Sequence, residues 1–153
     1  MGRRDSLPAP GCPRTGCPTS RPCHAEHVRG RSPGRSWGVV LEAPDARRLA
    51  RFYTQLLDWP IGEDDPAWVT LSPPDGSGSL AFQTSRDYER PVWPPEAGRQ
   101  QMMAHLDVEV DDLEEAVDSA LRLGATLAQY QPQEHVRVLL DPVGHPFCLY
   151  VEG

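Results

Sequence analysis

The chain contains the same order of predicted elements twice, and this duplication restricts its fold more than any other sequence feature. In the first half, a strand over 37–41 precedes a helix and then strands near 59–63, 67–71 and 79–84. In the second half, a strand over 102–110 precedes a helix and then strands near 125–129, 135–140 and 146–151. A duplication with a period of about 65 residues predicts one α+β domain. We expect two βαβββ repeats, at about 37–90 and 101–153, that form one curved mixed sheet with a concave pocket.

The spacing of apolar residues and the residues expected to cap the helix ends support the prediction of the two helices. The first helix is expected to have Asp45 as its N-cap, followed by an apolar face of Leu49, Phe52, Tyr53, Leu56 and Leu57. The second begins with a sequence that resembles a capping box, Asp111-Asp-Leu-Glu114. It ends before Gly124, which is expected to be left-handed because glycine favours that position after a helix.

Residues 1–36 differ from the rest of the chain in composition. They contain six prolines, five glycines and seven arginines, and they carry a net charge of +5. Because this segment has few large apolar residues, it is expected to be a disordered basic tail in front of a domain over 37–153. A tail zinc site is the alternative use of its thiols and imidazoles, but their spacing does not match a standard finger or ribbon: Cys12, Cys17, Cys23, His24 and His27.

Charge and hydropathy restrict the partners of the domain. Residues 37–153 carry a net charge of −12, which disfavours a nucleic-acid partner. No apolar run approaches the roughly 20 residues that span a bilayer, and none follows Arg3 and Arg4 as it would in a secretory signal. Three of the four cysteines lie in the tail, so a disulfide framework is not expected. We therefore expect a cytoplasmic protein without a membrane partner.

Strand alternation predicts which side chains line the concave face. In 101–110, one face is entirely apolar and must pack on the helices, which leaves His105 on the open face. The same reasoning for the other strands predicts a pocket wall with one of two tryptophans, Trp68 or Trp93, closing it. Its members are Gly38, Val40, Ala81, Gln83, Met103, His105, Cys148 and Tyr150. This mixture of apolar and polar groups suits a small organic ligand.

Three segments resemble the vicinal-oxygen-chelate superfamily, which includes glyoxalase, bleomycin-resistance and ring-cleaving dioxygenase proteins. Pro44-Asp45 followed by Arg51-Phe-Tyr-Thr-Gln-Leu-Leu-Asp-Trp59 resembles the first helix of the family. His105-Leu-Asp-Val-Glu-Val-Asp-Asp112 resembles the start of the second repeat, and Asp141-Pro-Val-Gly-His-Pro-Phe-Cys-Leu149 resembles the closing hairpin. The resemblance implies a glyoxalase-like fold from Trp37 to the end of the chain.

In metal-dependent members of that superfamily, four side chains from the first and last strands of each repeat hold a divalent ion. The resemblance places these four positions at Gly38, Gln83, His105 and Cys148. Glycine supplies no ligand and a glutamine amide binds only weakly, whereas a catalytic metal site usually has three protein ligands. The family's metal site is therefore expected to be incomplete, and no cofactor is assigned, with a divalent metal as the alternative.

The residues favour a ligand-binding protein whose chemistry, if it is an enzyme, centres on His105. That imidazole could be a hydrogen-bonding pocket residue, an acid or base, or a metal ligand, whereas Cys148 is expected to be an inert thiol. The preferred hypothesis is a glyoxalase-like protein that binds a small organic molecule. The alternatives are a metal-dependent lyase or isomerase of glyoxalase type and a drug-sequestering resistance protein, and a homodimer is expected from the superfamily.

Overall fold

A computed structural model describes residue 31 and residues 34–152 of the chain. The chain divides into two units, 1–35 and 36–153, and the second of these contains every helix and strand described below. The predicted tail and its cysteines and histidines lie almost entirely outside the described residues. Among the described residues, no helix is long and apolar enough to cross a membrane.

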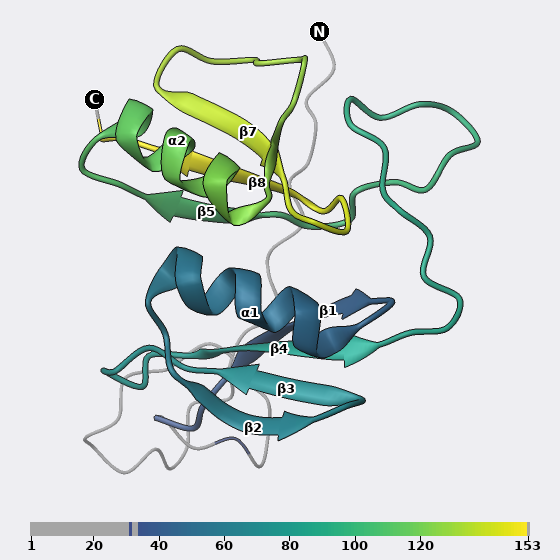
Figure 1. Cartoon of the computed structure of the whole chain (residues 1–153), viewed down its shortest axis with the longest axis vertical. Coiled ribbons are helices and arrows are strands. Elements are labelled where there is room, and N and C mark those ends of the chain that lie inside the picture. Colours follow the sequence, from purple (N-terminus) through teal and green to yellow (C-terminus); the bar gives the residue numbers. More distant parts are fainter. Residues whose placement is uncertain (1–30, 32–33, 153) are drawn as a thin grey trace, which may run out of the picture. The chain divides into compact units, whose positions relative to one another are not determined.

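The elements follow the predicted order, strand, helix and three strands, in each half. The first repeat contains β1 (Gly38–Ala43), α1 (Ala46–Leu57), β2 (Ile61–Asp65), β3 (Trp68–Leu71) and β4 (Ser79–Thr84). The second contains β5 (Leu106–Glu109), α2 (Leu113–Leu123), β6 (Thr126–Leu127), β7 (Val136–Leu140) and β8 (Pro146–Tyr150). The prediction of an α+β domain with two βαβββ repeats is therefore confirmed (Figure 1).

The eight strands form two four-stranded mixed sheets, in the orders β1-β4-β3-β2 and β5-β8-β7-β6. In each sheet the first and last strands of the repeat are parallel neighbours, and the remaining pairs are antiparallel. This corrects the expectation of one continuous sheet, because no strand of one sheet is paired with a strand of the other in the described structure. Apolar side chains and the two helices join the repeats instead.

Both helices begin and end as capped helices. The Asp45 carboxylate accepts a hydrogen bond from the Arg48 backbone N–H at 3.0 Å, as expected for an N-cap. In α2 the N-cap is Asp112, which accepts from the Glu115 N–H at 3.0 Å, so the cap lies one residue after the predicted start. Gly124 ends α2 with a φ of 107°, which confirms the prediction of a left-handed glycine.

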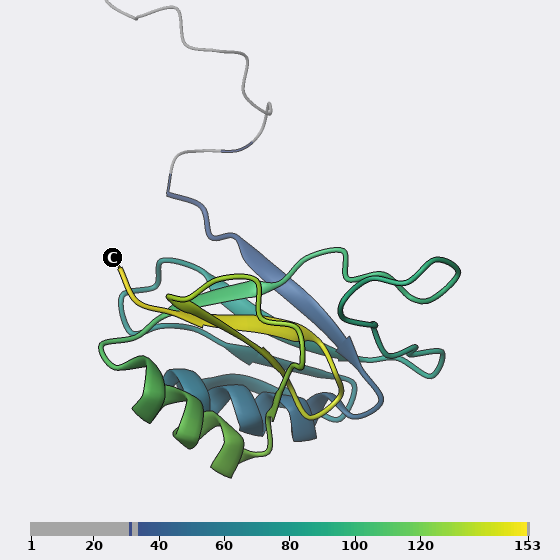
Figure 2. The same cartoon turned by 90° about the horizontal axis from the view of Figure 1, so that it is seen from above.

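An aromatic cluster joins the two repeats beneath the sheets. Figure 2 shows α1 and α2 on the same side of both sheets, and the two helices contact each other. Phe52 and Tyr53 of α1 are buried, and Tyr53 stacks on Phe82 of β4 with 5.5 Å between ring centroids. Phe52 also meets Phe147 of β8 edge to face at 5.9 Å. The core therefore runs across the boundary between the repeats, because side chains of α1 contact strands of both.

The strand predicted over 102–110 is shorter in the structure. β5 begins at Leu106, which pairs with Phe147, and His105 precedes the paired residues. The neighbouring strand β8 begins at Pro146, and a proline has no backbone N–H to extend the ladder. The open face predicted from alternation is nevertheless kept, because His105 and Asp107 are both exposed while Leu106 is half-buried.

Candidate functional site

Three polar side chains converge on the open face of the second repeat. Asp107 of β5 is the direct cross-strand partner of Cys148 of β8, and His105 lies two residues before Asp107 on the same face. The His105 Nε2 atom is 3.2 Å from the Asp107 Oδ1 atom. The Cys148 Sγ atom completes a group in which all three potential ligand atoms lie within 4.8 Å of one another.

A cavity of about 200 Å³ lies over this triad. Its wall combines the aromatic rings of a tryptophan and a tyrosine with aliphatic and polar groups from β5, β7, β8 and nearby loops: Trp93, His105, Asp107, Pro132, Gln133, Val136, Val138, Cys148 and Tyr150. A smaller cavity of about 30 Å³ adjoins it and shares Trp93, His105, Val138 and Cys148. The combination of apolar walls with a few convergent polar groups is typical of sites for small organic molecules.

Trp93 comes from the segment that joins the two repeats, between β4 and β5. Its indole Nε1–H donates a hydrogen bond to the Tyr130 carbonyl at 3.3 Å. The Trp93 and Tyr130 rings also contact each other, with 6.1 Å between their centroids. Of the two tryptophans that could close the pocket, Trp93 therefore lines it, whereas Trp68 lies in β3 of the first repeat.

The environment of Cys148 keeps its thiol protonated at neutral pH. Burial, followed by the nearby Asp107 carboxylate, raises the pKa of the Cys148 thiol to about 11. The nucleophilic form of cysteine is the thiolate, which is scarce far below the pKa. Without a bound cation, Cys148 is therefore a weak hydrogen-bonding group and not a nucleophile.

The remaining predicted pocket residues do not share this cavity. Val40 and Met103 line a separate cavity of about 400 Å³ that also contains Glu42, Tyr88 and His145. Ala81 is buried in β4 and Gln83 is exposed near its end, and neither lines either cavity. The structure thus brings together three of the predicted site residues, His105, Cys148 and Tyr150, within one repeat.

Gly38 has no room for a ligand side chain in this backbone. A Cβ atom at Gly38 would come within 2.8 Å of the Ser79 carbonyl oxygen on the neighbouring strand β4. That contact is shorter than real Cβ atoms make, and relieving it would require a shift of the β4 backbone. The absence of a ligand at this position is therefore a property of the close β1–β4 packing as well as of the residue.

Cross-strand register relates the two repeats residue by residue. Val40 pairs with Ala81 in the first repeat, and Asp107 pairs with Cys148 in the second. Each residue of the second pair lies 67 positions after its counterpart in the first pair. The same displacement relates Glu42–Gln83 to Glu109–Tyr150. Ala81 is therefore the counterpart of Cys148, and Gln83 is the counterpart of Tyr150. The first repeat has Gly38, Val40 and Ala81 where the second has His105, Asp107 and Cys148.

A buried polar cluster at the turn between β7 and β8 was not expected from the sequence. Asp141 is 1% exposed, and its Oδ1 atom accepts the backbone N–H groups of Val143, Gly144 and His145 at 2.7–3.0 Å. Its Oδ2 atom accepts the Tyr53 hydroxyl at 3.1 Å and lies 2.8 Å from His145 Nδ1. Asp141 was expected only to begin the closing hairpin, and no local sequence pattern indicates that Tyr53, 88 positions away, would reach it.

The cluster continues to Tyr88. The Tyr88 hydroxyl lies 3.1 Å from the Val143 carbonyl oxygen and 3.3 Å from His145 Nε2. Burial is the largest cause, and the Asp141 carboxylate the second, of the raised pKa values of Tyr53 and Tyr88. Both hydroxyls therefore remain protonated donors at neutral pH. Through Tyr53, the cluster ties the closing hairpin to α1.

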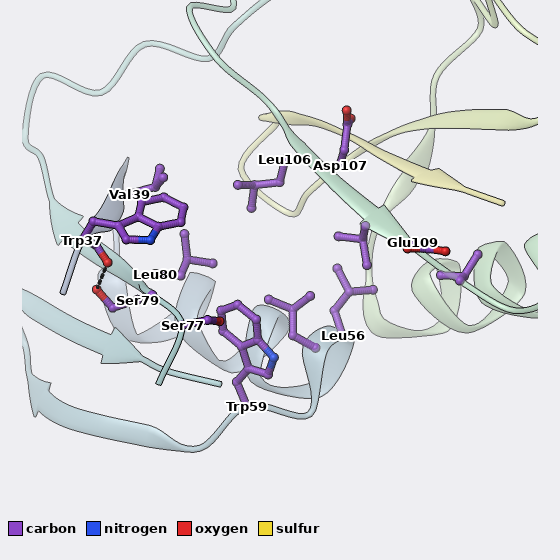
Figure 3. Close-up of a pocket in the computed structure, with 14 residues that line it drawn as sticks. Trp37, Val39, Leu56, Trp59, Ser77, Ser79, Leu80, Leu106, Asp107 and Glu109 are labelled. Atoms are coloured by element: carbon purple, nitrogen blue, oxygen red, sulfur yellow. Dashed lines mark hydrogen bonds between the residues drawn. The ribbon is translucent and has the colours of Figure 1, made fainter. Parts of the chain in front are cut away.

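A larger cavity of about 530 Å³ lies between the repeats on the helix side (Figure 3). Trp37, Leu56, Trp59 and Leu80 face it, and the apolar side of β5 forms the opposite wall. Asp107 belongs to this strand, but Figure 3 shows its carboxylate directed away from the cavity. This cavity therefore has mainly apolar walls, whereas the chemically active groups converge in the smaller pocket on the open face.

Known structures have the same fold. The structure resembles a glyoxalase/bleomycin resistance protein/dioxygenase family enzyme from Burkholderia phytofirmans, with a TM-score of 0.58, 21% identity, and coverage of 74% of this chain and 95% of the other. It also resembles a glyoxalase family protein from Enterococcus faecalis, with a TM-score of 0.56, 20% identity, and coverage of 76% and 97%. A third similar structure is lactoylglutathione lyase from Agrobacterium tumefaciens, with a TM-score of 0.52, 15% identity, and coverage of 79% of this chain and 96% of the other. These low identities show the fold alone.

No protein of curated function matches the sequence of the chain. The sequence profile of the glyoxalase-like domain family matches residues 38–150, which is most of the chain. This range begins with β1 and ends with β8, so it contains both repeats and the pocket of the second. The chain belongs to the glyoxalase-like domain family, within the vicinal-oxygen-chelate superfamily.

Proposed function

We propose that this glyoxalase-like protein binds a small organic molecule in the open-face pocket of its second repeat. The observation that carries the proposal is the convergence of His105, Asp107 and Cys148 beneath the aromatic side chains of Trp93 and Tyr150. Apolar walls remove ligand surface from water, while a few polar groups fix its orientation. The cavity of about 200 Å³ suits a small molecule or one part of a larger one.

Within this pocket, His105 is the residue proposed to act on the ligand. Its ring is 40% exposed, so a ligand can reach it, and its Nε2 atom faces the Asp107 carboxylate at 3.2 Å. A carboxylate beside an imidazole holds the ring in a fixed orientation. His105 can therefore hydrogen-bond a ligand or exchange a proton with it, whereas the protonated Cys148 thiol contributes polarity to the floor of the pocket.

A screen of small organic molecules by thermal shift, followed by titration of each hit, tests the binding proposal. Ligands should raise the unfolding midpoint because they bind only the folded state. Replacing Trp93 with alanine should weaken binding about tenfold or more, since buried aromatic contacts contribute most to affinity. Trp68→Ala is the matched control, because this half-buried tryptophan lies outside the pocket. Equal losses in both variants would contradict the proposed location.

The chemistry of the bound molecule separates the remaining functions. Product formation that is lost in His105→Ala, with ligand binding retained, would establish a lyase or isomerase of glyoxalase type. Recovery of every ligand unchanged would instead favour a sequestering protein. The cytoplasmic location and the homodimer stay predictions, which fractionation and light scattering would test.

A further inference from the structure

The triad in the second repeat combines three different kinds of metal donor. His105 offers an imidazole nitrogen, Asp107 a carboxylate oxygen and Cys148 a sulfur, and these atoms lie within 4.8 Å of one another. They come from two adjacent strands with a fixed register, since Asp107 pairs directly with Cys148. The His105 and Asp107 side chains are partly exposed, so small rotations can bring them closer to the sulfur. The sheet therefore fixes the backbone positions of the three residues, while side-chain rotation can still adjust the positions of their ligand atoms.

The arrangement differs from the one that the superfamily resemblance implies. Four ligands from both repeats would include Gly38, which supplies none, and Gln83, which lies outside the pocket of the triad. The residues present therefore do not fit the family's metal site. Asp107 is not among those four positions, yet the structure places its carboxylate 3.2 Å from His105 Nε2.

The distances agree with the dimensions of a tetrahedral centre. Zinc lies about 2.0–2.1 Å from histidine nitrogen or carboxylate oxygen and about 2.3 Å from cysteine sulfur, which places nitrogen and oxygen ligands roughly 3.3 Å apart. The observed separation of His105 Nε2 and Asp107 Oδ1 is 3.2 Å. Sulfur would lie roughly 3.6 Å from the other two ligands, so the 4.8 Å limit leaves at most a small closing movement of Cys148.

We propose that His105, Asp107 and Cys148 form a transition-metal site contained within the second repeat. Nitrogen and thiolate donors favour Zn²⁺ or Co²⁺ over Mg²⁺ or Mn²⁺, which prefer oxygen ligands. Three protein ligands leave a fourth position open toward the cavity of about 200 Å³. The inference deepens the proposed function and rests on it, because an organic ligand in the same cavity would adjoin the metal.

The test is a Co²⁺ titration of the full chain followed by absorption spectroscopy. The background carries Cys12→Ser, Cys17→Ser and Cys23→Ser, which leaves Cys148 as the single thiol in the sequence. Bound cobalt should show ultraviolet thiolate-to-metal charge transfer and the visible bands of a tetrahedral centre, at one ion per chain. Zn²⁺ should displace the cobalt and abolish the visible bands, whereas Mg²⁺ should not.

Variants assign the ligands one at a time. Cys148→Ser, or Cys148→Ala if the first variant folds poorly, should abolish the charge-transfer band. Asp107→Asn and His105→Ala should each weaken cobalt binding at least about tenfold. Losses of this size follow even the mutation of residues that only hydrogen-bond to a metal ligand. Glu109→Gln is the matched control, because this carboxylate lies on the same strand and face, beside Tyr150.

The possible results separate this inference from the proposed function. Absence of the charge-transfer band, or a band that persists in Cys148→Ser, would overturn the metal site. Equal effects of Asp107→Asn and Glu109→Gln would also overturn it, because they would indicate adventitious binding to an acidic surface. Titration of organic ligands in the presence of a chelator then tests the pocket alone. Ligand binding without cobalt binding would leave the proposed function standing and remove only the metal.

Discussion

The two repeats have the same topology, but they carry different kinds of residue at equivalent positions. Along the open face, the first repeat has Gly38, Val40 and Ala81, and the second has His105, Asp107 and Cys148. The helix side shows the reverse pattern, because Phe52 and Tyr53 of α1 correspond to Ser119 and Ala120 of α2. The same backbone topology therefore carries aromatic core residues in the first repeat and convergent polar side chains in the second.

This division separates stability from chemistry. The aromatic residues of α1 fill the space under both sheets, so the first repeat supports the second through Phe147 and Asp141. The open face of the second repeat is then free to carry polar groups that add little to packing. Substitutions at equivalent positions should consequently have unequal effects, and this inequality is directly measurable.

The largest expected difference lies on the helix side. Phe52→Ala should lower the free energy of unfolding by about 3–5 kcal/mol, because it opens a cavity among Tyr53, Phe147 and the strands. Ser119→Ala, at the equivalent position of α2, should change it by less than about 0.5 kcal/mol. Urea denaturation of both variants measures the two values. Similar losses at the two positions would show that the aromatic core is not concentrated in the first repeat.

The closing hairpins provide the second comparison. Asp141→Asn should lower the free energy of unfolding by about 2–4 kcal/mol, because the buried carboxylate accepts four hydrogen bonds and also lies 2.8 Å from His145 Nδ1, and an amide cannot replace all of these contacts. Asp75, in the corresponding hairpin of the first repeat, is exposed and accepts the Ser77 N–H at 3.0 Å. Asp75→Asn should leave the urea midpoint almost unchanged. If Asp75→Asn lowered stability as much as Asp141→Asn, the stabilisation would come from having an aspartate in the turn and not from the buried contacts of Asp141.

The smallest expected effect concerns the thiol of the second repeat, in a chain without metal. With the tail cysteines replaced by serine, alkylation of Cys148 should accelerate as pH rises toward about 11, since the thiolate is the reactive form. Burial is the larger cause of the raised pKa, so Asp107→Asn should lower the midpoint only part of the way toward 9.0. Glu109→Gln should leave it unchanged. A midpoint that is the same in Asp107→Asn would exclude the carboxylate as a cause.

The raised pKa also fixes the sign of a pH effect on stability. A thiol whose pKa is higher in the folded than in the unfolded chain favours folding of its protonated form. Its contribution is therefore fully present below pH 9.0 and is lost as the pH rises through about 11. Because Cys148 is partly exposed, solvent screening keeps this contribution small compared with the effects expected for Phe52 and Asp141.

Local sequence signals predicted much of the fold and one part of the site. The duplication, the strand and helix order, the N-cap at Asp45 and the left-handed Gly124 follow from spacing and from the conformational preferences of single residues. Alternation placed His105 and Asp107 on one open face, since successive side chains of a strand point to opposite sides. It did not identify Asp107 as a site residue, because a carboxylate on an open face is usually only solvated.

The tertiary structure decided which of these residues meet. The pairing of Asp107 with Cys148, the approach of Trp93 and the burial of Asp141 against Tyr53 join residues far apart in the chain. Sheet register and helix docking depend on the summed packing of many side chains, so no local pattern specifies them. The sequence by itself thus determined two βαβββ repeats and their exposed faces. Only long-range packing decided that the donors converge in one repeat, because that packing fixes how the strands lie beside one another.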